Sequence, residues 1–287
     1  MAMALEVPRK TSWIGLAWIG LLVLVCYAPV LRALVINWTV DADMGHGYFV
    51  PVIAGFIVWQ RREELRAIKP RPSWWGLPLV LMGGATLVIA TMGVEVFLGR
   101  FALLLTLTGI VWLLGGTHFL RRMAFPLALL FFMIPIPAIL YNRITLPLQD
   151  LATRLAAMNL EILGVPVVRD GNILELPTQR LQVVEACSGI RSLLSLTFLS
   201  MVYGYFCEKK TWIRWVLFLA TIPIAILANG SRVTFTGILG QINPAYAEGF
   251  FHESTGWVIF MIAMFIMVLF HQVIRRVLRL FPAKAAA

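Results

Sequence analysis

Apolar residues form long runs along the chain, and short basic or polar segments separate these runs. Several runs reach the ~20 residues that a helix needs to cross ~30 Å of hydrocarbon. A helix satisfies its own backbone hydrogen bonds, so it is the open structure that a bilayer tolerates. The pattern predicts an all-α polytopic membrane protein with one membrane domain over residues 1–287. Eight transmembrane helices are expected near residues 14–36, 47–60, 75–96, 101–117, 123–140, 188–206, 211–228 and 255–273.

The composition agrees with this pattern and excludes a soluble domain. Hydrophobic residues make up 60% of the chain and charged residues 13%, whereas soluble domains are roughly half apolar and a quarter charged. The net charge of +10 would suggest nucleic acid in a soluble protein. Here the basic residues lie in short loops between predicted spans, where they set orientation. We therefore expect membrane lipid around the protein and no nucleic-acid partner.

The basic residues occur in alternate connections between the spans. By the positive-inside rule these segments, both termini included, are predicted to be cytoplasmic. The loop 37–46, the short turn around Glu95 to Arg100, the insert 141–187 and the stretch 229–254 then lie on the extracytoplasmic side. The basic residues of the five predicted cytoplasmic segments are Arg9 and Lys10; Arg61, Arg62, Arg66, Lys69 and Arg71; Arg121 and Arg122; Lys209, Lys210 and Arg214; and Arg275, Arg276, Arg279 and Lys284.

The extracytoplasmic insert contains patterns of both helix and strand. Its apolar residues recur at alternating steps of four and three, which predicts an amphipathic helix that ends at Gly164 and Pro166 and lies on the membrane surface. Residues 165–176 read as a β-hairpin turning at Asp170-Gly171, and 182–185 as a third strand that leads into Cys187. The apolar residues of the helix are Ile144, Leu148, Leu151, Leu155, Met158 and Ile162.

Cys187 lies in the segment Glu185-Ala-Cys-Ser-Gly-Ile-Arg-Ser192, between a predicted strand and a predicted span. The N–H groups at a helix N-terminus favour a thiolate and can also hold a developing oxyanion. Arg191 follows by four residues, one helical turn, and could stabilise the thiolate or hold a substrate carboxylate; snorkelling to the membrane surface explains it equally well. Cys26 and Cys207 lie in or beside apolar runs and read as structural thiols, so we expect no disulfide framework.

Two further segments on the same side carry ionisable residues. Ala228-Asn-Gly-Ser-Arg-Val233 ends the seventh predicted span and places Arg232 against the positive-inside rule. Such an arginine needs a partner or a function. His252 precedes the last span, where an imidazole could accept the thiol proton and protonate a leaving amine. Alternatively, Ser254 or Thr255 caps the helix and the histidine is incidental.

The other histidines are divided by topology. His46 is a second candidate on the extracytoplasmic side, whereas His118 and His271 fall on the cytoplasmic side. Asp41, Asp43 and His46 match no standard metal-site spacing. The sequence therefore predicts no metal and no cofactor.

The three segments around Cys187, Arg232 and His252 resemble, in this order, the motifs of the exosortase family, which is similar to the archaeosortases. The resemblance covers residues 40–270 and includes Gly45-His46-Gly47-Tyr48. It implies a membrane cysteine protease or transpeptidase of Gram-negative inner membranes. Cys187 would form a thioester, His252 would transfer the proton, and Arg232 would stabilise the anionic intermediate. The substrate-binding residues assigned beside them are Arg191, Ser188, Glu185, Asn229 and His46.

The resemblance also implies the partners. The substrates would be secreted proteins with a C-terminal sorting signal of the PEP-CTERM type, which consists of a Pro-Glu-Pro motif, an apolar helix and a basic tail. A surface glycan or glycolipid is the expected acceptor, because the family often accompanies exopolysaccharide biosynthesis.

Three alternatives to a transpeptidase stay open from the residues alone. A polytopic transporter should place ionisable or unwound segments near mid-membrane, whereas these candidates collect at one face. A scaffold component of exopolysaccharide export would not need Cys187. An intramembrane protease would let water complete the reaction.

Overall fold

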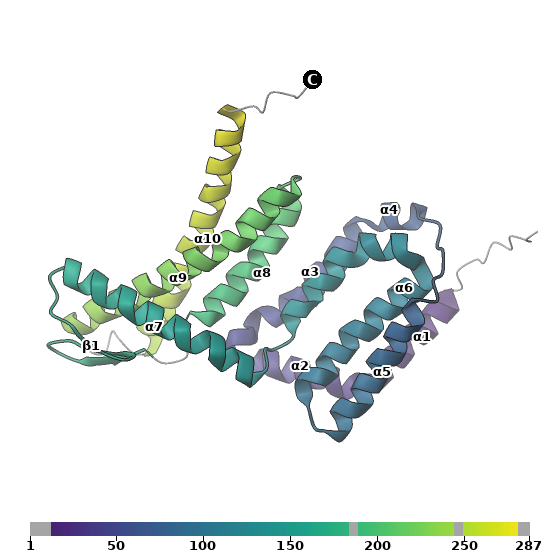
Figure 1. Cartoon of the computed structure of the whole chain (residues 1–287), viewed down its shortest axis with the longest axis horizontal. Helices are drawn as coiled ribbons and strands as arrows, with labels where there is room; N and C mark the ends of the chain where they lie inside the picture. The colour runs from purple at the N-terminus through teal and green to yellow at the C-terminus, as the bar shows by residue number, and fades with distance from the viewer. Residues whose placement is uncertain (1–12, 184–188, 244–248, 281–287) are drawn as a thin grey trace, which may run out of the picture. The chain divides into compact units, whose positions relative to one another are not determined.

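The computed structural model describes residues 13–183, 189–243 and 249–280, with only the backbone in 249–253. The chain forms two compact units, Met1–Pro135 and Ile136–Ala287. The prediction of one membrane domain over 1–287 stays a prediction. Figure 1 labels the elements of both units.

Unit 1 is helical throughout its described part. Helices α5 and α6 lie side by side (Figure 1), and small residues allow the close approach: a Cβ on Gly109 would stand 2.8 Å from Val80. Tyr27 adds a buried hydrogen bond of 2.6 Å between its hydroxyl and Thr106 Oγ1. The elements are α1 (Trp13–Cys26), α2 (Ala28–Val40), the 3-10 helix η1 (Ala42–Tyr48), α3 (Phe49–Gln60), α4 (Arg62–Ala67), α5 (Gly76–Met92), α6 (Val96–Leu129) and the 3-10 helix η2 (Leu130–Met133).

Gly116 divides α6 into two helical parts. Its φ of 77° and ψ of 179° are not helical. This positive φ is a conformation that glycine adopts without the steric cost of a Cβ. The sequence predicts one span over 101–117 and the next over 123–140. Gly116 lies one residue before the end of the first of these spans, so the break in α6 is close to the predicted boundary.

The number of predicted spans is not confirmed. Among the described residues, four helices are long and apolar enough to cross a membrane, or five if α1 and α2, which bend by 65°, form one span. Helices α3, with 12 residues, and α5, with 17, are shorter than the ~20 residues of a span. The four are Val96–Met133, Ile190–Cys207, Thr211–Ile242 and Ser254–Leu280. The chain is thus a multi-pass membrane protein.

Unit 2 begins with the predicted insert and its small sheet. Three strands pair antiparallel in the order β1-β2-β3, and Gly171, with a φ of 59°, lies in the turn between β1 and β2. The predicted hairpin is confirmed. The third strand forms at 180–182 and overlaps the predicted strand 182–185 at Gln182, while residues 184 and 185 lie outside the described residues. The elements are α7 (Ala138–Ile162), β1 (Val168–Asp170), β2 (Ile173–Glu175), β3 (Arg180–Gln182), α8 (Ile190–Cys207), α9 (Thr211–Ile242) and α10 (Gly249–Leu280).

Helix α7 confirms the predicted amphipathic helix, and the structure shows which of its sides faces the protein. Leu151, Met158 and Ile162 of the apolar stripe are exposed. The buried face carries smaller or polar residues instead, so that α7 can lie close against α9; a Cβ on Gly230 would stand 2.8 Å from Leu155. The buried residues of α7 are Thr145, Gln149, Ala152, Thr153, Ala156, Ala157 and Leu160. The exposed apolar side suits a helix on a membrane surface.

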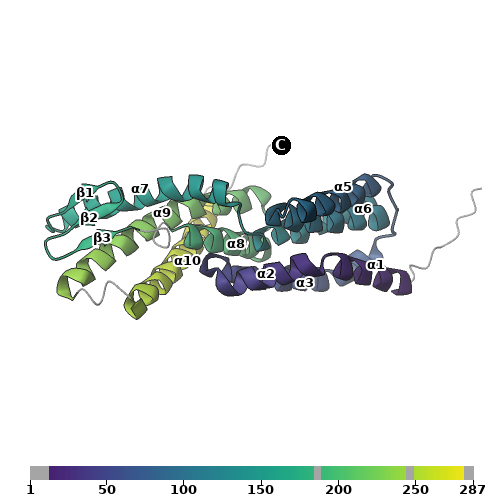
Figure 2. The same ribbon diagram turned by 90° about the horizontal axis from the view of Figure 1, so that it is seen from below.

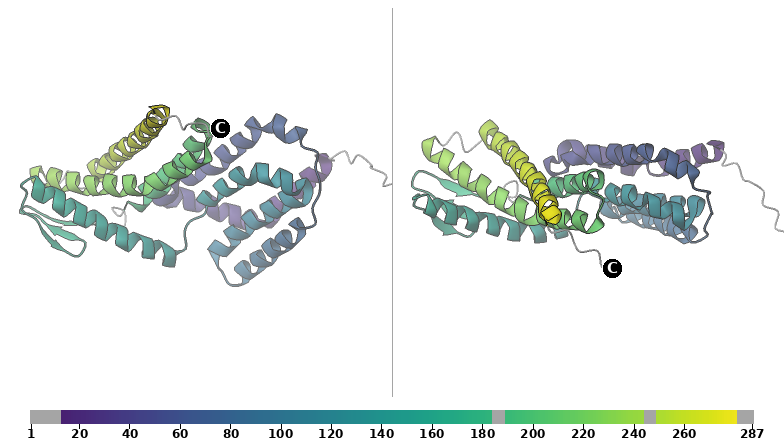
Figure 3. Two further views of the ribbon diagram at one scale, coloured as in Figure 1. Left: turned by 45° about the horizontal axis from the view of Figure 1, so that its top comes forward. Right: turned by 90° about the horizontal axis from the view of Figure 1, so that it is seen from above.

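Helix α7, the sheet and α9 share one core. Figure 2 shows the three strands next to α7 and α9 from below. Helices α8, α9 and α10 share a second core, built on Leu196, Ala225, Ala263 and Met267. Figure 3 shows these three helices from two further sides. The first core holds the insert against α9, and the second joins the helices that carry the three sequence motifs.

Candidate functional site

The predicted nucleophile and the predicted general base border residues that the structure describes. Glu185, Cys187 and Ser188 lie outside the described residues, which resume at Gly189. His252 lies in the first turns of α10, where the backbone alone is described. The site is therefore built from Gly189, Asn229, Arg232 and Gly256, which border those two positions in the chain.

Gly189 connects the cysteine motif to the arginine motif. It caps α8 with a φ of 84°, a left-handed conformation. A Cβ at Gly189 would stand 2.7 Å from Asn229 Cγ and 2.8 Å from its Cβ. Asn229 itself is only 4% exposed. The backbone two residues after Cys187 thus packs directly on the Asn229 side chain of α9, and only glycine fits that contact.

Arg232 connects the arginine motif to α10. It follows Asn229 by three residues on α9, nearly one turn. A Cβ at Gly256 would stand 3.1 Å from Arg232 Cζ and 3.2 Å from Nη2. The guanidinium therefore lies against the bare backbone of α10, four residues after His252.

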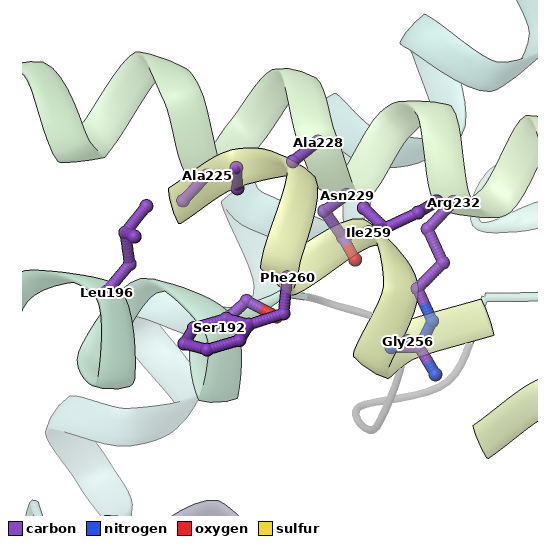
Figure 4. A pocket seen from close by; sticks show the side chains of 10 residues that line it. Ser192, Leu196, Ala225, Ala228, Asn229, Arg232, Gly256, Ile259 and Phe260 are labelled. Carbon is purple, nitrogen blue, oxygen red and sulfur yellow. The ribbon is translucent and has the colours of Figure 1, made fainter. Parts of the chain in front are cut away.

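A small pocket lies where these contacts meet. Asn229, Arg232 and Ser192 provide its polar groups. In Figure 4 Arg232 lies toward one end of the pocket and Leu196 toward the other. It leaves about 10 Å³ for the centre of a water molecule, enough for about one water. The lining residues come from α8 (Ser192, Leu196), α9 (Ala225, Ala228, Asn229, Arg232) and α10 (Gly256, Ile259, Phe260, Ala263).

Three predicted helix boundaries near the site were wrong. Helix α8 begins at Ile190 after the left-handed Gly189, so Cys187 precedes the helix and the step of four to Arg191 is not a helical turn. Helix α9 continues through the asparagine-arginine motif to Ile242. Helix α10 starts at Gly249, which puts His252 inside it and leaves Ser254 and Thr255 beyond the cap position. Arg191, on the first turn of α8, is exposed.

Arg232 can still lie near a membrane boundary although α9 is long. It stands 21 residues after Thr211, the first residue of α9, which corresponds to about 32 Å along the axis. A hydrocarbon core is ~30 Å thick. A helix that enters the bilayer near Thr211 would therefore bring Arg232 to the other surface.

His46, the remaining substrate-binding candidate, lies in η1 of unit 1, whereas Asn229 and Arg232 belong to unit 2. Burial lowers the pKa of its imidazole below the usual value, against backbone hydrogen bonds with Phe132 and Asp43 that raise it.

The expectations of no metal site and no disulfide framework concern residues outside this pocket. Across the described part of the chain, no group of three or more His, Cys, Asp or Glu side chains is arranged to hold a metal ion. Near His46, the Asp41 carboxylate accepts a hydrogen bond of 2.9 Å from the backbone N–H of Asp43. Cys26 and Cys207 are free and exposed.

Sequence reasoning missed Gly256, Ser192 and Phe260. Gly256 and Ser192 end the two motifs that contain His252 and Cys187, so their positions were visible. Their contacts depend on how α8, α9 and α10 cross one another. The hydropathy of the sequence does not predict how helices cross.

The Gly189 contact predicts a sharp difference between two glycines with positive φ. At Gly189, the Cβ of an alanine would be strained by the positive φ and would also clash with Asn229. At Gly171, where φ is 59°, the same backbone strain applies, but the Cβ would have no neighbouring atom within 4 Å. We expect Gly171→Ala to cost about 1 kcal/mol of unfolding free energy and Gly189→Ala more than about 2 kcal/mol. Thermal unfolding in detergent measures both. Equal losses would contradict the contact.

One comparison with known proteins identifies a family. A family model described as transmembrane exosortase matches residues 38–269. Neither the curated proteins nor the solved structures give a match. The matched range contains Gly189, Asn229, Arg232 and Gly256, as well as the positions of Cys187 and His252.

Proposed function

We propose, from the premise that this chain belongs to the transmembrane exosortase family, that it is a membrane cysteine transpeptidase with Cys187 as its nucleophile. Arg232 stabilises the anionic intermediate and His252 transfers the proton. The family match supports a thiol enzyme over a transporter or a scaffold, since exosortases are generally cysteine transpeptidases.

The two glycine contacts support the proposal most directly. Gly189 lies on Asn229, and Gly256 lies on Arg232, so three distant segments meet at one place on α9. Two peptide units limit the distance from the Gly189 Cα to the Cys187 Cα to about 7.6 Å. His252 precedes Gly256 by four residues, about 6 Å along α10 and on a similar face. Both positions therefore lie close in the chain to residues that contact α9 beside Arg232, and this supports assigning the three groups to one site.

The reaction follows from these groups. The Cys187 thiolate attacks the carbonyl carbon of a peptide bond, and the negative charge that develops on the oxygen is stabilised by the Arg232 guanidinium. The C–N bond breaks as His252 gives a proton to the leaving nitrogen. A nucleophile then attacks the thioester, passes its proton to His252 and releases Cys187.

The substrate is a secreted protein with a C-terminal sorting signal, delivered in the membrane by the apolar helix of that signal. Arg191, on the first turn of α8, lies within reach of an acidic residue in the signal. Glu185, Ser188 and Asn229 complete the proposed binding residues of unit 2, and a binding role of His46 in unit 1 stays a prediction. A glycan or glycolipid at the surface is the proposed acceptor.

The positive-inside pattern supports an active site on the periplasmic side of the inner membrane, with both termini in the cytoplasm. A membrane-impermeant maleimide added to spheroplasts then labels Cys187 and spares Cys207. Labelling of Cys207 from outside would contradict this orientation.

Gly256 offers a prediction specific to this arrangement. Alanine places a Cβ 3.1 Å from Arg232 Cζ, so the guanidinium must shift by a few tenths of an ångström, and valine forces a larger shift. Small misplacements of a catalytic group can cost up to about 100-fold in rate. We expect processing to fall in the order wild type, Gly256→Ala, Gly256→Val.

Gly84→Ala is the control, because a Cβ there has nothing within 4 Å. Reporter processing and thermal unfolding are measured for each variant. Full activity in Gly256→Val would contradict the role of this contact.

The function is tested with a secreted reporter that ends in Pro-Glu-Pro, an apolar helix and a basic tail, co-expressed with the enzyme. Hydroxylamine added to membranes should intercept the thioester and leave a hydroxamate at the new C-terminus of the reporter. A free carboxylate alone, even at high hydroxylamine, would favour hydrolysis over transfer. An uncut reporter that is stably expressed would contradict the proposed substrate.

A further inference from the structure

A buried polar network lies at the other end of the α8–α10 bundle, away from the candidate site. The Tyr203 hydroxyl and His271 Nδ1 are 2.9 Å apart, and His271 Nε2 and Glu208 Oε2 are 3.0 Å apart. His271 is 1% exposed and Glu208 8% exposed. The three residues come from α8, from the connection between α8 and α9, and from α10.

Glu208 is held rigidly in the connection between α8 and α9. Its Oε1 accepts hydrogen bonds of 2.7 and 2.9 Å from the backbone N–H groups of Lys209 and Lys210. Its backbone carbonyl accepts a bond of 2.8 Å from Arg214 Nε. The N–H of Lys210, and after it the His271 bond, hold the pKa of Glu208 at about 2. A lowered pKa means that this stabilisation is present above the carboxyl's ordinary pKa and is lost as the pH falls through about 2.

The chemistry of these bonds assigns roles to the ring nitrogens. Glu208 is ionised and can only accept, so Nε2 of His271 must donate to it. When the imidazole is neutral, Nδ1 accepts from the Tyr203 hydroxyl. Both ring nitrogens of His271 are thus occupied by partners on neighbouring elements.

The described packing of α10 against α8 and α9 is otherwise mainly apolar. Within residues 254–280, His271 is the one buried polar side chain, and the face toward α8 and α9 is otherwise apolar, with Phe260, Ala263 and Met267. Apolar contacts are non-directional, so they hold a helix close without defining its axial position sharply. A buried polar group is a recognised means of setting register between helices.

We propose that Tyr203, His271 and Glu208 form a lock that sets the axial register of α10 against α8 and α9. His271 lies 15 residues after Gly256, about 22 Å along the same helix. An axial slip at His271 therefore moves Gly256 and His252 past Arg232 by the same amount. In this way the lock positions the candidate site, a consequence that rests on the proposed function.

Disulfide cross-linking between α9 and α10 tests the register without any substrate. The background is a chain in which Cys26, Cys187 and Cys207 are replaced by serine. One probe pairs Ala225→Cys with Ala263→Cys, whose side chains line the same pocket. A second probe pairs Ala225→Cys with Met267→Cys, about one turn further along α10. The ratio of the two cross-linking yields reports the register.

We expect His271→Ala to change this ratio several-fold, because both bonds of the lock are lost. His271→Gln should keep the ratio near that of the parent, since its amide can still donate to Glu208. Gln272→Ala, at the exposed neighbouring position, is the matched control and should change nothing. An unchanged ratio in His271→Ala would overturn the lock.

A milder variant covers the case in which His271→Ala does not accumulate in membranes. Tyr203→Phe removes one hydroxyl and should shift the ratio in the same direction by less; no shift would again overturn the lock. Reporter processing, measured with Cys187 restored, tests the link to the site separately. A shifted ratio with full processing would overturn that link, while failure of the proposed function would leave the cross-linking result intact.

Discussion

Cys187→Ala should reduce reporter processing by more than about 10³-fold, the scale of losing a catalytic nucleophile. The loss should come without a change in expression or thermal unfolding, because a small side chain replaces another of similar size. The measurement is the fraction of reporter cut per unit of membrane enzyme.

Two cysteines in the same chain provide the controls for this result. Cys26 and Cys207 are free and exposed, and neither borders the Asn229–Arg232 pocket. Cys26→Ala and Cys207→Ala should process the reporter at the parental rate. Equal activity of Cys187→Ala and Cys207→Ala would mean that the thiol has no part in the reaction, as the scaffold alternative requires.

Arg232→Lys should lower the turnover rate by about 10²–10³-fold, the range seen when one group that stabilises an oxyanion is removed. Lysine keeps the charge but not the planar, forked guanidinium that lies against Gly256. We therefore expect the loss in the rate constant more than in substrate affinity. Single-turnover kinetics in detergent separate the two.

Arg279→Lys is the matched control for this substitution, because Arg279 is exposed in the last turn of α10. It should behave like the parent. If Arg232→Lys kept full turnover, charge alone would suffice and the role given to the Gly256 contact would be wrong.

The helical fold and the insert could be read from the sequence because both depend on local patterns. Apolar runs predict helices through burial of their side chains, and the Asp170-Gly171 pair predicted the hairpin through its turn chemistry. The steps of four and three also predicted α7. Which residues of α7 are buried depends on its packing against the sheet and α9, which is a tertiary property.

The ends of the helices were harder to predict because hydropathy does not mark them. Helix α9 runs past Arg232, since nothing between Asn229 and Val233 breaks a helix once α7 and α10 pack around it. Helix α8 begins late, because Gly189 adopts a left-handed conformation that its contact with Asn229 requires. Both errors lie at the candidate site, where packing overrides local preference.

The chemistry of their side chains made the candidate residues visible in the sequence. Their neighbours became visible only through the packing of the helices in the structure. Arg232 was conspicuous because it stands against the charge pattern of the loops. Gly256 and the lock of Tyr203, His271 and Glu208 gave no such signal, and topology alone set His271 aside. Its burial and its two partners become apparent only once α8 and α10 are placed side by side.

Peptide mass spectrometry of the acid-quenched enzyme, taken during reporter processing, tests the central claim most directly. It should find Cys187 carrying the upstream fragment of the reporter through a bond that hydroxylamine cleaves, and this adduct should be reduced in Arg232→Lys. A reporter that is cut while Cys187 stays unmodified, or an adduct on Cys207 in its place, would contradict the account.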